Sequence, residues 1–250
     1  MPKKITFTQF AVKLKRALKP MLEAALEGEN GRELKISIGH FLIDGKRTQT
    51  VPPKPSAAAK YQGMVFSAFA EISASFYTLR DIEGLLGTTT SRRTKIMKAD
   101  VLAYHVHNFL NENYILKLRL RQFVVKLLRA SNQSSTHKQI VKAIEEALDK
   151  VFENIVRTRG GHVHDRRYTD DDLDRLSMLE LMAEENTPLG KAVADLFKLE
   201  FASSRRRWLE RMRANNDTLE TLLDAYCTGL YPLIFDASGN IIVPKSMKGA

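Results

Sequence analysis

The sequence predicts a mainly α-helical protein, and three observations support this prediction. Apolar residues recur at spacings of three, four or seven over most of the 250-residue chain, as expected of amphipathic helices. Glycines, prolines and polar turns separate these periodic segments. Strand-like alternation is confined to residues 34–43 and to a predicted hairpin at residues 233–243. We expect the two to pair in a small β element built from both ends of the chain.

The N-terminal segment, residues 1–55, is expected to contain a helix, a strand and a linker. Apolar residues follow one another at a spacing of four over residues 7–27, and Pro20 predicts a kink or a break within this helix. Three prolines lie between Thr48 and Pro55 and mark a linker, so the first domain boundary is predicted there.

The central segment, residues 56–185, is expected to form a helical bundle. Its first two helices should span about 56–86, with Ser56 as the N-cap, and about 95–130. A third amphipathic helix should start at Thr136, and a fourth is expected after it, capped by Thr169.

The second long helix carries polar residues near the centre of its apolar face. Burying a polar group without a partner costs about 1–3 kcal/mol, so these side chains must find partners or line a polar space. Two interpretations stay open, an internal hydrogen-bond network that fixes the helix register and a polar cleft. The residues concerned are His105, Asn108, Glu112 and Arg119.

The C-terminal segment, residues 186–250, is expected to pack on the bundle as two further helices and the hairpin. One helix should run from Pro188 to Met212, and a second, capped by Asn216 or Asp217, should end at Gly229. The first of these contains an arginine-rich stretch, either a basic face or a solvated helix surface: Arg205, Arg206, Arg207, Arg211 and Arg213.

Charge and composition limit the classes of partner. The net charge of +10 favours polyanions, although acidic residues outnumber basic ones over residues 131–185. The single cysteine, Cys227, excludes an internal disulfide framework. We find neither an apolar stretch of about 20 residues nor an apolar secretory signal, so we expect a cytoplasmic protein without a membrane segment.

The residues that carry chemistry cluster at the end of the third bundle helix. Arg159 continues its apolar stripe, whereas Arg157 points about 160° away from Arg159. Gly160-Gly161 is expected to end the helix, because glycine readily takes the left-handed conformation that follows a helix end. His162 and His164 should therefore lie just outside the helix.

An arginine and a histidine at this place suggest phosphate chemistry. An imidazole titrates near neutral pH and can move a proton to or from a ribose hydroxyl, while a guanidinium can stabilise an extra charge on phosphate. Together they suffice for attack of an RNA 2′-hydroxyl on the adjacent phosphate, without a metal or cofactor. A metal site is disfavoured because His105 and His107 would point apart on a helix, whereas His162 and His164 lack obvious further ligands. The structural alternative is that the histidines cap the helix.

Arg159-x4-His164 resembles the Arg-x(4–6)-His motif of the HEPN superfamily (higher eukaryotes and prokaryotes nucleotide-binding). Arg157-x6-His164 also fits the permitted spacing. The two long helices preceding the motif are similar to the antiparallel helices of that family, and the resemblance covers residues 56–185. It therefore implies a HEPN-like antiparallel helical bundle.

The resemblance further implies a metal-independent endoribonuclease that works as a homodimer and leaves 2′,3′-cyclic phosphate and 5′-hydroxyl ends. Arg159 and His164 would take the catalytic roles. An antitoxin or effector partner and a role as a toxin or in defence come with the same resemblance. The supporting residues would be His162, Asn108, Glu112 and His105, and the substrate-binding residues Arg157, Arg166 and Arg167.

The chain departs from the family pattern in two places. Gly160 stands where a polar residue often follows the family's arginine, and Arg166 stands where the nucleotidylated toxin branch carries a tyrosine. Two other classes of function stay open, a non-catalytic RNA- or nucleotide-binding module and a structural dimerisation protein.

Overall fold

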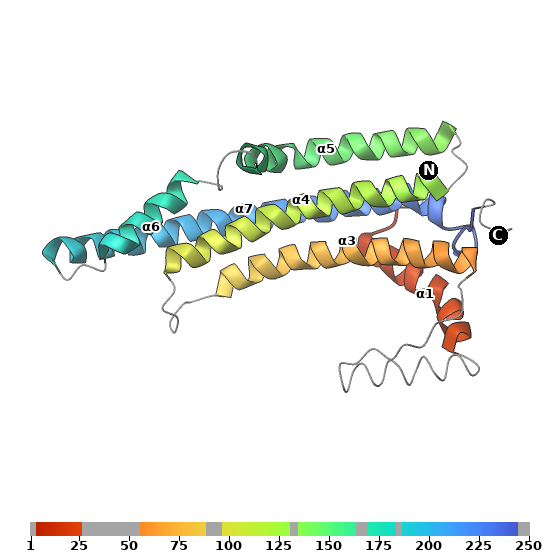
Figure 1. Ribbon diagram of the computed structural model, residues 1–250, viewed down its shortest axis with the longest axis horizontal. Helices are drawn as coiled ribbons and strands as arrows, with labels where there is room; N and C mark the ends of the chain where they lie inside the picture. The colour runs from red at the N-terminus through yellow and green to blue at the C-terminus, as the bar shows by residue number, and fades with distance from the viewer. Residues whose placement is uncertain are drawn as a thin grey trace. The chain divides into compact units, whose positions relative to one another are not determined.

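The computed structural model describes residues 4–26, 56–88, 97–130, 135–163, 170–183 and 187–244 (Figure 1). Within these ranges the protein is mainly α-helical, which confirms the predicted class. None of the described helices is both long and apolar enough to cross a membrane. The helices are α1 (Phe7–Leu26), α3 (Ala57–Thr88), α4 (Lys98–Ala130), α5 (Ser135–Val163), α6 (Asp171–Ala183) and α7 (Pro188–Ile234).

The chain divides into two compact units. Unit 1 comprises Met1–Ala70, Gln122–Ile144 and Leu223–Ala250, and unit 2 comprises Glu71–Arg121 and Glu145–Leu222. Helices α3, α4, α5 and α7 each contribute to both units. The domain boundaries expected after residues 55 and 185 stay predictions.

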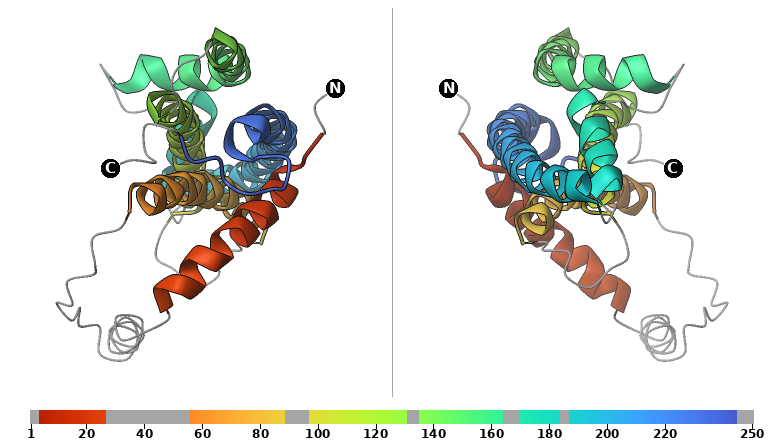
Figure 2. Two further views of the ribbon diagram at one scale, coloured as in Figure 1. Left: turned by 90° about the vertical axis from the view of Figure 1, so that its right-hand side faces the viewer. Right: turned by 90° about the vertical axis from the view of Figure 1, so that its left-hand side faces the viewer.

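An aromatic cluster forms the core of unit 1. The Phe69 ring on α3 lies 5.1 Å from the Phe7 ring and 5.0 Å from the Phe10 ring, both on α1. Phe10 also meets Phe235, just past α7, edge to face at 5.3 Å. Tilted and edge-to-face pairs at these distances are favourable beyond their buried area. The cluster fixes α1, which runs obliquely to the start of α3 (Figure 2, red and orange), against two other parts of the sequence.

Hydrogen bonds hold the start of the described chain on the last turns of α7. The Thr228 hydroxyl accepts from the Ile5 amide at 3.1 Å and donates to the Ile5 carbonyl at 3.0 Å. The Phe7 amide, at the beginning of α1, donates to Asp224 Oδ1 at 2.7 Å. A carboxylate at this position also faces the positive end of the α1 dipole. Helix α1 then continues past Pro20, so this proline does not end the helix.

The small β element is not confirmed. Residues 34–43 lie outside the described part, and the C-terminal hairpin is reduced to one antiparallel bridge between Phe235 and Ile241. Helix α7 extends through Ile234, which is fully buried, so residues expected in a strand complete a buried helix turn instead. The predicted turn after Phe235 is present. Gly239 has a φ of 86°, and the Asp236 carboxylate accepts hydrogen bonds from two amides of the turn.

Apolar stripes of the predicted spacing form the core of unit 2. They come from α3, α4, α5, α6 and α7, and Ser56 caps α3 as predicted, since its hydroxyl accepts from the Ala59 amide at 3.1 Å. The largest core side chains of unit 2 that are less than 2% exposed are Ile72, Leu79, Leu102, Leu116, Leu120, Leu148, Phe152 and Leu176.

Helix α7 is one helix of 47 residues, and the expected break near Asn216 is wrong. A free asparagine can cap a new helix through its side chain. Here the Asn216 amide group instead donates to Glu83 Oε2 on α3 at 2.8 Å, and Asn215 donates to Asn113 Oδ1 on α4 at 2.9 Å. The two asparagines are therefore engaged with neighbouring helices, and the backbone continues in helical conformation.

Candidate functional site

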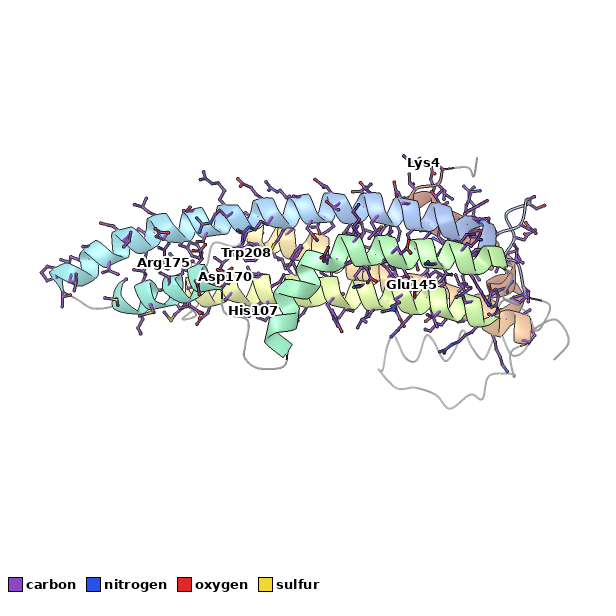
Figure 3. All side chains as sticks on the ribbon, turned by 90° about the horizontal axis from the view of Figure 1, so that it is seen from above. Lys4, His107, Glu145, Asp170, Arg175 and Trp208 are labelled. Carbon is purple, nitrogen blue, oxygen red and sulfur yellow. The ribbon has the colours of Figure 1, made fainter. Side chains whose placement is uncertain are left out.

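The helix that carries the predicted motif does not end at Gly160-Gly161. Helix α5 runs to Val163, so this prediction is wrong and His162 lies in the last helical turn. Two glycines cost a helix about 1 kcal/mol each relative to alanine, which a helix anchored elsewhere can sustain. Figure 3 shows that the C-terminal part of α5 turns away from the direction of the helix before it.

The structure describes the backbone but not the side chains at the end of α5. Arg157, Arg159 and His162 thus have known positions on the helix, two or three residues apart, and Arg157 lies about 160° around the helix from Arg159. His164, Arg166 and Arg167 lie outside the described residues.

Two ion pairs in unit 2 attach α5 to α4 ahead of the motif. Lys117 Nζ lies 2.8 Å from Asp149 Oδ1, and Arg121 Nε lies 3.5 Å from Glu145 Oε1 (Glu145 is labelled in Figure 3). The hydrogen bond from Lys117 lowers the pKa of the Asp149 carboxyl below its ordinary value. Partly exposed ion pairs of this kind each contribute at most about 1 kcal/mol to the free energy of unfolding. Their main effect is therefore to fix the register of α5 against α4.

Helix α6, which follows the motif, is anchored at its start. Asp170 caps it by accepting the Asp172 and Leu173 amides at 3.0 and 3.3 Å (Figure 3), so the expectation that Thr169 would be the cap is wrong. The Asp170 carboxylate reaches two unpaired amides at once and faces the positive end of the helix. Arg207 on α7 donates to Asp172 Oδ2 at 2.8 Å.

Beyond its first turn, α6 is attached to α4 and again to α7. Both Glu180 oxygens accept backbone amides at the start of α4, from Lys98 at 2.8 Å and Ala99 at 2.7 Å. Arg175 donates to Glu200 on α7 at 2.7 Å (Figure 3). The six residues 164–169 therefore connect two helices that are each held by their neighbours within unit 2.

Glu112, one of the predicted supporting residues, belongs to a hydrogen-bond network between α3 and α4. The buried Ser75 hydroxyl donates to Glu112 Oε1 at 2.5 Å, and Arg119 Nη1 lies 3.5 Å from the same oxygen. Arg119 also donates to Ser75 Oγ and to the Glu71 carbonyl, the latter at 3.0 Å. The internal-network interpretation therefore holds for Glu112 and Arg119, whose charges compensate each other.

His105 and Asn108 lie on the same helix, one turn apart, and both are half-buried. Burial lowers the pKa of His105 below 6.5, so its imidazole is neutral at pH 7. The ring contacts Tyr104 edge to face at 5.8 Å. Since a helix rises 1.5 Å per residue, His105 lies about 10 Å along α4 from Glu112, and the two cannot hydrogen-bond directly.

A second group of polar contacts, which the sequence patterns did not reveal, surrounds the buried Asn113 and Asn216 in unit 2. Asn113 donates to the Phe109 carbonyl at 2.8 Å and accepts from Asn215, while Glu83 accepts from Asn216 and, at 3.2 Å, from Arg213. The available signal was the asparagines within apolar stripes. The partners of Asn215 and Asn216 lie more than 100 residues away along the chain, so the pairing could not be predicted from the local sequence.

Several arginines in the arginine-rich stretch of α7 contact neighbouring groups and contribute to helix packing. Arg205 closes the C-terminal end of α3 by donating to the Leu86 carbonyl at 2.9 and 2.8 Å and to the Gly87 carbonyl at 2.7 Å. Arg211 lies over the Trp208 ring at 5.1 Å. Arg206 and Arg211 of the stretch are exposed and have no ion-pair or hydrogen-bond partner among the described residues.

Within the described parts of the chain, no group of three or more metal-ligating side chains comes together. Comparison with protein-family models, with curated proteins and with solved structures found no match to this chain. What defines the candidate site is therefore the Arg-x4-His motif of the sequence, in which Arg159 belongs to the described backbone of α5 and His164 lies outside the described residues.

Proposed function

We propose that the protein is a metal-independent endoribonuclease that uses Arg159 and His164. The observation that carries this proposal is their position: Arg159 lies in the last turns of α5, and His164 is the first residue after its end at Val163. Helices α5 and α6 on either side are both anchored in unit 2. Anchored flanks support the proposal because catalytic geometry requires a rigid scaffold.

In this mechanism the imidazole of His164 moves the proton. It removes the proton from the ribose 2′-hydroxyl or donates one to the departing 5′-oxygen, and general acid or base catalysis of this kind contributes about 10²–10⁴-fold. The guanidinium of Arg159 stabilises the charge that accumulates on the phosphate. The 2′-oxygen forms a bond to phosphorus as the bond to the 5′-oxygen breaks, which leaves a 2′,3′-cyclic phosphate and a 5′-hydroxyl.

The remaining predicted residues take secondary roles. His162, His105 and Asn108 would orient the reacting groups, and Arg157, Arg166 and Arg167 would attract the RNA backbone. Glu112 is proposed to act only indirectly, since its carboxylate is occupied by Ser75 and Arg119. A homodimer that places two motifs at one cleft is part of the same proposal.

The test compares cleavage of single-stranded and structured RNA in EDTA by the wild type, Arg159→Ala and His164→Ala. Arg206→Ala is the matched control, because it removes one positive charge from an exposed helix position. We expect cleavage to fall at least about 100-fold in the first two variants and to stay unchanged in the control. Cleavage retained in both variants would falsify the assignment of the site.

Other outcomes of this experiment identify the alternatives. Salt-sensitive RNA binding without cleavage, weakened by Arg159→Ala and His164→Ala, would identify a binding module. A stable dimer that neither binds nor cleaves RNA would identify a structural protein. Sedimentation of the wild type supplies the oligomeric state in both cases.

A further inference from the structure

Unit 1 contains a cavity of about 350 Å³ that the proposed nuclease mechanism does not use. Its walls come from the residues before α1, from one face of α1 and from the last turns of α7. A volume in this range suits a small ligand. The lining residues are Lys4, Ile5, Thr8, Gln9, Val12, Lys13, Arg16 and Tyr231.

The cavity is lined by three cationic side chains. Lys4, labelled in Figure 3, and Arg16 are exposed, whereas Lys13 is half-buried. Among the described residues, no carboxylate lies within ion-pair distance of any of the three. Their charges are thus uncompensated by described groups and favour an anion, with a dianion such as phosphate matching them best.

Lys13 and Tyr231 are arranged to bind such an anion together. Lys13 Nζ donates to the Tyr231 hydroxyl at 2.9 Å, which uses one of its three protons. The Tyr231 hydroxyl acts as acceptor in this bond, so its own proton is directed elsewhere. Two ammonium protons and one phenolic proton can therefore meet the same oxyanion.

Apart from the polar Thr8 and Gln9, the remainder of the lining is apolar or aromatic. Ile5 is 4% exposed and forms part of the wall, and Val12 is 45% exposed. The Tyr231 ring lies 5.1 Å from the Phe235 ring in a tilted contact that holds it in place. An inorganic ion would leave this surface in water. A ligand with an apolar or flat body beside its phosphate would bury it.

We propose that this cavity binds a phosphate monoester with a compact apolar or aromatic body, held through Lys4, Lys13, Arg16 and Tyr231. The site lies in unit 1, whereas Arg159 and the α5–α6 connection belong to unit 2, so this proposal does not depend on the nuclease. The same phosphate chemistry occurs in free metabolites and in lipid headgroups.

The test is calorimetric titration of the whole 250-residue chain with phenyl phosphate, inorganic phosphate and phenol. Phenyl phosphate is expected to bind more tightly than either part alone. Arg16→Gln should weaken it about tenfold, the usual loss for a charge-assisted hydrogen bond. Tyr231→Phe keeps the ring but removes the hydroxyl and should weaken it about threefold.

Lys15→Gln is the matched control, since Lys15 is an exposed cation of the same helix that does not line the cavity. It should leave the affinity within about twofold of the wild type, and thermal melting of each variant verifies folding. Phenyl phosphate bound no more tightly than inorganic phosphate, or an equal loss in Lys15→Gln and Arg16→Gln, overturns the proposal.

Vesicles of phosphatidylcholine with and without phosphatidic acid distinguish the two sources of phosphate. Binding to the acidic vesicles that phenyl phosphate competes away supports the site and points to a headgroup. Phenyl phosphate binding without vesicle binding supports the site with a free metabolite as ligand.

Discussion

Replacing Phe152 by alanine tests how the helix that bears the motif is held. Phe152 is fully buried, and Arg159 follows it on α5 by seven residues, or about two turns. A buried Phe→Ala change costs about 3–5 kcal/mol in the free energy of unfolding, because it removes apolar burial and leaves a cavity. For a chain of this size the melting temperature should fall by about 6–20 °C.

The assay is urea and thermal unfolding of Phe152→Ala beside Glu153→Ala. Glu153 is the next residue and is exposed, so its variant should remain within about 0.5 kcal/mol of the wild type. A loss below about 1 kcal/mol in Phe152→Ala would refute the reasoning, since it would mean that α5 is not packed through this face.

Three further predictions concern the helix ends and the half-buried histidine. Gly160→Ala and Gly161→Ala should each stabilise the last turns of α5 by up to about 1 kcal/mol and preserve RNA cleavage. Circular dichroism measures the helix content, and the EDTA assay measures cleavage. Loss of cleavage would mean that the active form needs a helix break at these glycines. Arg205→Ala should lower the free energy of unfolding by about 1–3 kcal/mol, because the carbonyls at the end of α3 lose their hydrogen-bond partner. Arg206→Ala should have little effect in the same urea titration. His105 should titrate below 6.5 by NMR, and an unchanged or raised midpoint would contradict its burial. Because the unfolded chain binds this proton more readily than the folded chain, the contribution of His105 to stability should fall as the pH drops from 6.5 towards the folded-state pKa.

Much of the fold followed from local features of the sequence. Ser56 caps α3 and the apolar stripes became the cores because N-caps and helical periodicity depend on residues three or four positions apart. The polar face of α4 was recognised in the same way. The sequence could not decide between a hydrogen-bond network and a polar cleft at Glu112, because the partner of Glu112 is Ser75 on another helix.

The errors arose where distant partners override a local signal. Asn216 looks like a cap in the sequence, but Glu83 on α3 engages its side chain and α7 continues. A different error concerns Gly160-Gly161, which resembles a helix end, yet α5 extends to Val163. Arg205 resembles part of a basic surface, although its hydrogen bonds go to the end of α3.

The candidate sites differ in how far the sequence could reveal them. Arg159 and His164 form a local motif, so their pairing could be predicted, while the role assigned to it stays a proposal. The unit 1 cavity combines Lys13 with Tyr231, 218 residues apart, and only the folded chain brings them together.

The most direct test of the central claim is the chemistry of the RNA ends formed in EDTA. Mass spectrometry of the products, with kinase labelling of free 5′-hydroxyls, reports both ends of each cut. The mechanism of Arg159 and His164 predicts 2′,3′-cyclic phosphates and 5′-hydroxyls, formed without a divalent metal. Cuts that appear only with added Mg²⁺ and leave 3′-hydroxyl and 5′-phosphate ends would contradict it.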